Sequence, residues 1–427
     1  MIAVLWMALV LAQDTVRATQ PLELGDAYRT ARERSPRIAA ARSLADAVRA
    51  RTASARRPPD PQVQLGFMNY ALPGLRPMDV VGMTQLQAMQ MLPVAGQLGL
   101  AGRVADASAD AQAERSRDVA WEVRSKAAMV FYDLYATDRS LSIDRETLRL
   151  LQDILRITEA MYRVGDGRQA DVLRAQVEIA RMVQDTIRMT AMRSAMAARF
   201  NALLDLAADT FVGSPALPAF PDSVPPMEFA VRAALADRPM LRAGERDLDA
   251  ATVQTTLVRR EIWPDLTIGV QYAQRNGMDG KERMGSLMFG ATLPVFARSR
   301  QLRMRDEAAA MQQMFRAELL AMRAETQAAV VEAYSNVVRA RNVAAVYRST
   351  ILPQAEATVA SALTAYRVGA VDFMTLLDNR MSVNRYHKEL VSLEADEGKA
   401  WADLEMLLGR ELFDPQSRAR PITSERK

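Results

Sequence analysis

Tyr162-Arg163-Val164-Gly165 and Tyr366-Arg367-Val368-Gly369 are the same four residues, found 204 positions apart in the chain. Other landmarks recur in the same order at offsets of 201 to 203 residues, namely Pro36 with Pro239, Pro61 with Pro264, and Pro93 with Pro294. Such constant spacing indicates that the chain contains two copies of one unit. Whatever function the unit has, the chain therefore carries it twice.

Each Tyr-Arg-Val-Gly stretch closes a long segment that lacks helix breakers. No Gly or Pro occurs between Arg103 and Val164, and Pro353 is the only one between Ala297 and Val368. A single helix over 297–365 would hold 69 residues and extend about 100 Å. Apolar residues recur at helical spacing with charged residues between them. The pattern predicts long coiled-coil helices, each followed after the turn by a shorter return helix.

Short segments with a period of two precede each long helix. Residues 265–272 alternate polar and apolar side chains, and residues 287–293 continue the period after a predicted loop at 275–284. In the first copy, residues 63–67 alternate clearly and residues 86–88 more weakly. Strands of about ten residues have the length needed to cross a bilayer in a tilted barrel. Four strands cannot close a barrel, so either several chains share one barrel or the segments form an ordinary soluble sheet.

These patterns predict the organisation of the whole chain. The first repeat is 19–210, with strands at about 61–70 and 83–92 and helices at about 22–57, 95–162 and 168–208. The second repeat is 227–412, with strands at about 264–274 and 285–294 and helices at about 228–261, 297–366 and 371–409. A Pro-rich linker at 211–226 separates the repeats, and a polar tail at 413–427 is expected to be disordered.

The amino-terminal residues form an apolar run that is too short to span a bilayer. Residues 2–12 are apolar, and small residues follow. This pattern indicates a secretory signal peptide at 1–18, with cleavage after Ala12 or Ala18, or alternatively a buried apolar helix.

Composition argues against several classes of site. The 427 residues contain no Cys, which excludes disulfides and thiolate chemistry, and the single His387 argues against an imidazole-based zinc or catalytic site. The net charge of +4 is too small to indicate nucleic-acid binding. Because the sequence also lacks nucleophile and phosphate-loop motifs, we expect neither enzymatic activity nor a cofactor or resident metal.

Together these features give the chain a family resemblance. The duplicated unit, the strand pairs ending in Leu92-Pro93 and Leu293-Pro294, and the twin Tyr-Arg-Val-Gly turns carry it, with residues 372–378 (DFMTLLD) after the second turn. The chain resembles the TolC family of outer-membrane efflux ducts. The resemblance implies a mainly α fold with a small β part: a homotrimer whose twelve-stranded barrel lies in the outer-membrane lipid of a Gram-negative bacterium and continues into a periplasmic helical barrel. It also implies a passive duct that works with a periplasmic adaptor and an inner-membrane pump of the RND type.

The resemblance also implies two sets of site residues. Adaptor docking at the hairpin tips falls on Val164, Gly165, Val368 and Gly369, and the two glycines are expected to take the left-handed conformation of a tight turn. The periplasmic constriction falls on Tyr162, Asp171, Tyr366, Thr375 and Asp378.

Within the constriction the sequence departs from the family pattern. Thr375 replaces one of two family aspartates, the other being Asp378, and Val371 replaces the arginine with which Asp171 would pair. The nearby arginines 163, 168 and 367 are either substitute partners or solvated helix-end charges.

The sequence leaves the exported substrate open. Met78, Met83, Met89 and Met91 lie close together, and thioethers are soft ligands for Cu(I), although methionine is also an ordinary core residue. Residues 92–97 resemble the metal-efflux branch of the family, which points to metal cations. The alternative function is a secreted or periplasmic coiled-coil scaffold.

Overall fold

The computed structural model describes residues 21–71, 73–74, 76–78, 81–277 and 280–413. The expected signal peptide at 1–18 lies outside the described residues, as does the expected tail apart from Phe413. The chain divides into two compact units, and each repeat contributes to both. We call them the helical unit (Met1–Ala40, Arg117–Arg238 and Ala324–Lys427) and the sheet unit (Ala41–Ser116 and Pro239–Arg323).

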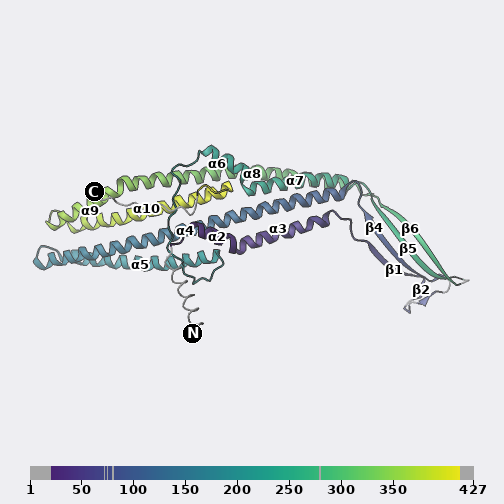
Figure 1. Ribbon diagram of the computed structural model, residues 1–427, viewed down its shortest axis with the longest axis horizontal. Coiled ribbons are helices and arrows are strands. Elements are labelled where there is room, and N and C mark those ends of the chain that lie inside the picture. Colours follow the sequence, from purple (N-terminus) through teal and green to yellow (C-terminus); the bar gives the residue numbers. More distant parts are fainter. Residues whose placement is uncertain (1–20, 72, 75, 79–80, 278–279, 414–427) are drawn as a thin grey trace, which may run out of the picture. The chain divides into compact units, whose positions relative to one another are not determined.

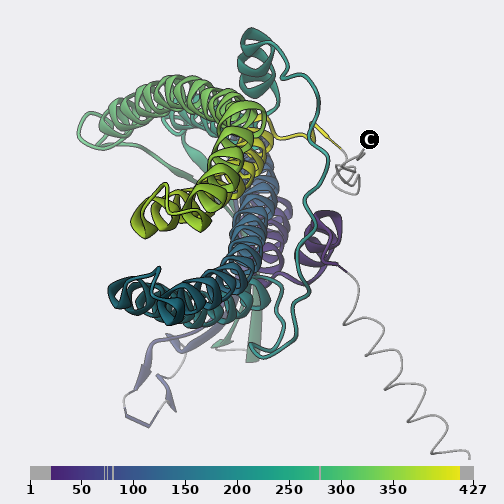
Figure 2. The same ribbon diagram turned by 90° about the vertical axis from the view of Figure 1, so that its left-hand side faces the viewer.

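The helical unit is built on two helical hairpins. Helix α4 (Gln97–Val164), which enters this unit at Arg117, is followed by α5 (Gln169–Leu203). Helix α9 (Leu352–Arg367) is followed by α10 (Phe373–Leu408). In both views the two helices of each hairpin lie side by side (Figures 1 and 2). The shorter helices α2 (Leu24–Arg34) and α6 (Met227–Asp237) belong to the same unit.

Close packing of α4 against α10 forms the centre of the helical unit. Tyr132 and Trp401 are fully buried in neighbouring apolar clusters. Gly398 makes the contact possible, because a Cβ atom at this position would lie 2.3 Å from the Tyr132 ring. Such overlap is sterically impossible in a close-packed core, so a side chain at 398 would push the two helices apart.

The predicted helix at 297–366 begins later than expected and contains a wide turn. Helix α8 (Gln301–Val346) leads into the π-helical turn η2 (Tyr347–Ile351), which continues directly into α9. The amide of Leu352 donates to the carbonyl of Tyr347, five residues back. Pro353 accounts for this turn, since its ring lacks an N–H and clashes with the carbonyl four residues earlier in a regular α-helix. The helix therefore bulges at the proline without ending.

Two predicted helices, 22–57 and 228–261, are each broken in the middle. The first is α2 and α3 (Pro36–Ala55), and the second is α6 and α7 (Pro239–Arg260). Each second helix starts at a proline, and the residue before it has the same backbone angles in both repeats, with φ −59° and ψ 120°. Proline disfavours the helical conformation of the preceding residue, which explains both breaks.

The sheet unit contains a four-stranded antiparallel sheet in the order β1-β4-β5-β6. The strands are β1 (Gln62–Met68), β4 (Met83–Leu92), β5 (Asp265–Gly277) and β6 (Gly280–Thr292). The hairpins of the two repeats join through β4 and β5, which places β1 and β6 at the edges. A small ladder of β2 (Tyr70–Ala71) and β3 (Arg76–Pro77) lies within the first hairpin.

The predicted loop at 275–284 is largely strand. Strands β5 and β6 stay paired as far as Gly277 and Gly280, and each has 13 residues. Cross-strand charge helps this extension, because the Arg275 guanidinium Nε lies 2.7 Å from a carboxylate oxygen of Glu282. Polar composition alone therefore misplaced the ends of these strands.

Residues 211–226, the predicted linker, contain no helix, and Leu22 pairs with Pro215 in an isolated parallel bridge. None of the described helices combines the length and apolar composition needed to cross a bilayer.

Candidate functional sites at the hairpin turns and on the sheet

Both Tyr-Arg-Val-Gly turns have the geometry expected of glycine. Gly165 and Gly369 adopt φ values of +90° and +71°, and their amides donate to Tyr162 and Tyr366 carbonyls at 3.1 and 3.0 Å. A Cβ atom at either glycine would meet nothing within 4 Å, so the backbone conformation alone selects glycine here. The neighbouring Val164 and Val368 are 72% and 76% exposed. Each turn therefore presents an aliphatic side chain beside an open glycine.

The two tyrosines of the repeated motif lie in different environments. Tyr366 is buried, its hydroxyl donates to Thr158 Oγ1 at 3.4 Å, and its ring contacts Phe373 edge-on at 5.9 Å between centroids. Tyr162 is 46% exposed. The Tyr366 ring thus packs across its hairpin, while its hydroxyl bonds to α4 of the same chain. Tyr366 is one of the residues that join the two hairpins.

The residues after the second turn form a helix cap. The carboxylate of Asp372 accepts hydrogen bonds from the amide of Thr375, at 3.0 Å, and from its hydroxyl. These bonds, the hydroxyl bond first, lower the pKa of Asp372, and the charge of Arg168 lowers it further. Thr375, predicted to line the constriction, is therefore engaged in capping α10. An Asp directly before an apolar helical run is an N-cap signal, and the assignment of Thr375 to the constriction did not take it into account.

The two predicted constriction aspartates, Asp171 and Asp378, lie on different hairpins. Asp378 is exposed on α10, and Asp171 is half-buried in the first turn of α5. Within the described part of the chain, Asp171 takes part in no ion pair. Arg168, one of the three proposed partner arginines, acts instead on Asp372 of the other hairpin.

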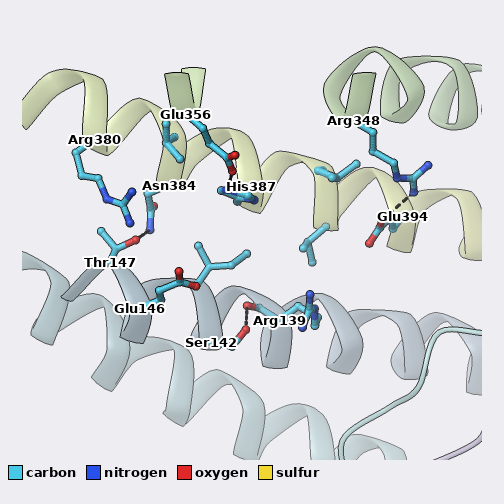
Figure 3. A pocket seen from close by; sticks show the side chains of 14 residues that line it. Arg139, Ser142, Glu146, Thr147, Arg348, Glu356, Arg380, Asn384, His387 and Glu394 are labelled. Atoms are coloured by element: carbon cyan, nitrogen blue, oxygen red, sulfur yellow. Dashed lines mark hydrogen bonds and ion pairs between the residues drawn. The ribbon is translucent and has the colours of Figure 1, made fainter. Parts of the chain in front are cut away.

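A charged cavity of about 500 Å³ lies among α4, η2, α9 and α10 (Figure 3). Arg348 donates to Glu394 at 2.8 Å, and His387 Nε2 lies 3.0 Å from Glu356. Burial lowers the pKa of Arg380, against the opposing effect of nearby Glu146 and Glu356 charges. Sequence reasoning missed this cavity, because its residues come from segments more than 200 positions apart.

A buried polar cluster fixes α4 against α10 next to this cavity. The carboxylate of Asp144 is fully buried and accepts from Lys388 Nζ at 3.0 and 3.1 Å and from Asn384 Nδ2 at 3.1 Å. The same amide group donates to Thr147 Oγ1 at 2.8 Å. Buried charge is tolerated only when paired in this way. The cluster therefore sets the register of one hairpin on the other.

The sheet has two chemically distinct faces, which follow from the pairing register and the strand period of two. On one face lie all the large aliphatic and aromatic residues of the four strands, and we call it the aliphatic face. Its residues are Val63, Leu65, Phe67, Leu86, Leu92, Leu266, Ile268, Val270, Tyr272, Leu287 and Phe289. Most of these are strongly exposed in the single chain, for example Leu287 at 71% and Phe289 at 78%.

All six methionines of the four strands lie on the opposite face, which we call the methionine face. They are Met68, Met83, Met89, Met91, Met284 and Met288. Glutamines lie between them, and Gln271 Nε2 donates to Gln85 Oε1 at 2.6 Å. In these described strands the methionine face carries no Leu, Ile, Val or aromatic residue. Among the described residues, no group of three or more His, Asp or Glu side chains is placed to hold a metal ion.

Comparison with known proteins shows which family has this architecture. A family model described as outer membrane efflux protein matches residues 27–205 and 230–410, one match in each repeat. No curated protein matches the chain. Three solved channel structures share its fold with TM-scores of 0.76 to 0.77: VceC of Vibrio cholerae, the open state of MtrE of Neisseria gonorrhoeae, and CusC.

The three structures resemble the chain over almost its whole length at low sequence identity. VceC is 15% identical, with 91% of this chain and 96% of VceC covered. MtrE is 15% identical, with 91% and 89% covered, and CusC is 17% identical, with 91% and 92% covered. The prediction of a mainly α fold with a small β part is confirmed, and so is the family resemblance.

Channels of this family form trimers in the outer membrane of Gram-negative bacteria and work with an adaptor and an inner-membrane pump. They are channels rather than enzymes, and the scaffold alternative is not favoured. Because the family model matches both repeats, the chain belongs to the outer membrane efflux protein family, the channel components of tripartite efflux systems.

Proposed function

We propose that three copies of this chain form one passive exit duct. The four-stranded sheet carries this proposal, because its aliphatic face is broadly exposed and the outer edges of β1 and β6 are not paired with another strand within the described chain. In lipid, an unpaired strand edge leaves backbone donors and acceptors unsatisfied at a cost of several kcal/mol per group. Pairing β6 of one copy with β1 of the next removes both edges and gives a twelve-stranded barrel.

The two faces of the sheet suit two different environments, lipid on one side and the interior of the duct on the other. We assign the aliphatic face to the acyl chains of the outer membrane, since hydrocarbon tolerates Leu, Ile and Phe but not bare amides. The methionine face, with its glutamines, then lines the interior. In this arrangement the duct binds no cofactor and catalyses no reaction.

We assign adaptor docking to the hairpin tips. Val164 and Val368 are exposed beside open glycines, which leaves room for a partner helix to approach the backbone closely. An inner-membrane pump of the RND type would deliver substrate to the adaptor. Tyr162, Asp171, Tyr366, Thr375 and Asp378 stay assigned to the constriction beside these tips, where the Tyr366–Thr158 bond joins the two hairpins.

A double substitution, Val164→Glu with Val368→Glu, tests docking. Both side chains are more than 70% exposed, so the change should alter folding by less than about 0.5 kcal/mol. We expect export to fall to the level of a deletion strain, because each substitution places an unpaired charge in an apolar contact. Export is measured as survival on a panel of metals, detergents and dyes, and trimer content by size exclusion in detergent.

Ile187→Glu on α5 is the matched control. Ile187 is similarly exposed, at 66%, but it lies in the middle of its helix and not at a hairpin turn. The control should export normally. Normal export by the double tip variant with an intact trimer would overturn tip docking.

A further inference from the structure

The methionine face concentrates thioether groups in a way that core packing does not explain. Six methionines occupy one face of the four strands, and the aliphatic face has none. If methionine served here as a flexible apolar residue, it would be expected on the aliphatic face, among the leucines and phenylalanines. Instead it lies on the polar side of the sheet, the face that also carries Gln85, Gln87 and Gln271.

Met89 and Met288 converge over one glycine. The three residues Met89, Gly269 and Met288 are paired directly across β4, β5 and β6. A Cβ atom at position 269 would lie 3.1 Å from Met288 Cε and 3.2 Å from Met89 Cγ. The absent side chain is thus what lets both methionines lean over the middle strand from either side.

The surroundings of this pair are polar. Gln87 Nε2 lies 3.7 Å from the Met288 sulfur, within the range for a weak N–H···S hydrogen bond, which marks that sulfur as an accessible electron donor. The pair is partly exposed rather than buried. Thioether sulfur is a soft ligand that selects soft monovalent cations such as Cu(I), whereas hard cations prefer carboxylate and carbonyl oxygen.

We propose that Met89 and Met288 form a binding site for soft monovalent metal cations. The same face offers further thioethers at Met68, Met83, Met91 and Met284. The inference rests on the proposed function, in which this face lines the interior of the duct. A row of partly exposed neutral sulfurs favours transient contacts, because conduction requires binding that is weak and repeated along the path.

Silver(I) is a suitable probe, since it is soft and stable in air. Full-length protein in detergent is incubated with Ag(I), passed through a desalting column, and analysed for retained silver by mass spectrometry. Met89→Leu with Met288→Leu removes both sulfurs at nearly constant volume, so the sheet should fold normally. We expect this variant to retain less Ag(I) than the wild type, because the two converging soft thioether ligands are gone.

The matched control is Met311→Leu with Met314→Leu, which removes two exposed thioethers from α8. The control should retain as much Ag(I) as the wild type. Equal retention by the sheet variant, an equal loss in the α8 control, or no Ag(I) retained by the wild type would each overturn the proposal.

The hairpin-tip variant separates this inference from the proposed function. Purified protein that carries both Val164→Glu and Val368→Glu should still retain Ag(I). Cells that express the same variant should fail to export. If it exports normally, tip docking fails and the methionine site is unaffected. If the wild type retains no Ag(I) but the tip variant loses export, the metal inference alone is wrong.

Discussion

At the scale of single residues, Asp144 makes the sharpest prediction about stability. Its carboxylate is fully buried and paired with Lys388 and Asn384. Asp144→Ala leaves the Lys388 ammonium without its partner, and we expect the free energy of unfolding to fall by about 3 kcal/mol. Thermal unfolding in detergent, followed by circular dichroism, measures the change.

Asp153→Ala on the same helix is the control for Asp144. Asp153 pairs with Arg156, but both side chains are more than half exposed. Exposed pairs contribute little, so this variant should unfold within about 0.5 kcal/mol of the wild type. Equal losses for the two variants would contradict the role given to the buried cluster.

Residue types alone could not separate Tyr162 from Tyr366. Both occupy the same place in the same motif, and sequence reasoning gave them the same role. Their environments differ because Tyr366 meets Thr158 and Phe373, whereas Tyr162 is exposed. The contact between Tyr366 and Thr158 joins segments that lie 208 residues apart, and a local pattern carries no information about such a pair. By contrast, the left-handed turns at Gly165 and Gly369 are local, and they were predicted.

At the scale of elements, the cap of α10 can be compared directly with its counterpart in the first repeat. Asp372 caps α10 through its side chain, while Arg168, 204 residues earlier, is the N-cap of α5 and makes no side-chain cap bond. We therefore expect Asp372→Ala to speed amide hydrogen exchange in the first turn of α10. Arg168→Ala should leave exchange in α5 unchanged.

The same cap should depend on pH in a defined direction. The folded pKa of Asp372 lies below its usual value of 3.8. The stabilisation by the ionised carboxylate is thus fully present above pH 3.8 and is lost as the pH falls through the lowered pKa. If Asp372→Ala leaves amide exchange in this turn unchanged at neutral pH, the Asp372 cap does not stabilise the first turn of α10.

The existence of the elements was easier to predict than their ends. Helical and strand periods persist over many residues, so the long helices and the four strands were recognised. The breaks before Pro36 and Pro239 were missed, although proline is a local signal, because the apolar pattern continues across them. The length of β5 and β6 was missed for another reason, since cross-strand pairing sustains residues such as Arg275 that have little strand propensity alone.

At the scale of the whole molecule, the unpaired sheet edges predict where copies meet. The natural chain has no cysteine, so any disulfide arises only from introduced residues. Gln64→Cys in β1 is combined in turn with Ser286→Cys, Met288→Cys or Gly290→Cys in β6, all on the methionine face. We expect at least one combination to give covalent trimers on a denaturing gel after mild oxidation.

Gln64→Cys combined with a cysteine at Gln271 of β5, a central strand, is the control and should give no covalent trimer. If no β1–β6 combination crosslinks while the protein remains a compact water-soluble monomer, the shared barrel is wrong. From the residues alone, the strand count left a shared barrel and an ordinary soluble sheet both open, and the family resemblance implied the trimer. The order β1-β4-β5-β6, which leaves one edge from each repeat free, came from the structure.

The π turn at Tyr347–Ile351 has a consequence for the orientation of the second tip. The π turn holds one residue more than a regular α turn. Every later side chain is therefore rotated about the helix axis by about 100° from the position it would have in an uninterrupted α-helix. The bearing of Tyr366 toward Thr158 is thus fixed 13 residues upstream, by the imino ring of Pro353. The direction in which the side chains of the second tip point therefore depends on a proline that lies 13 residues before Tyr366 in the helix.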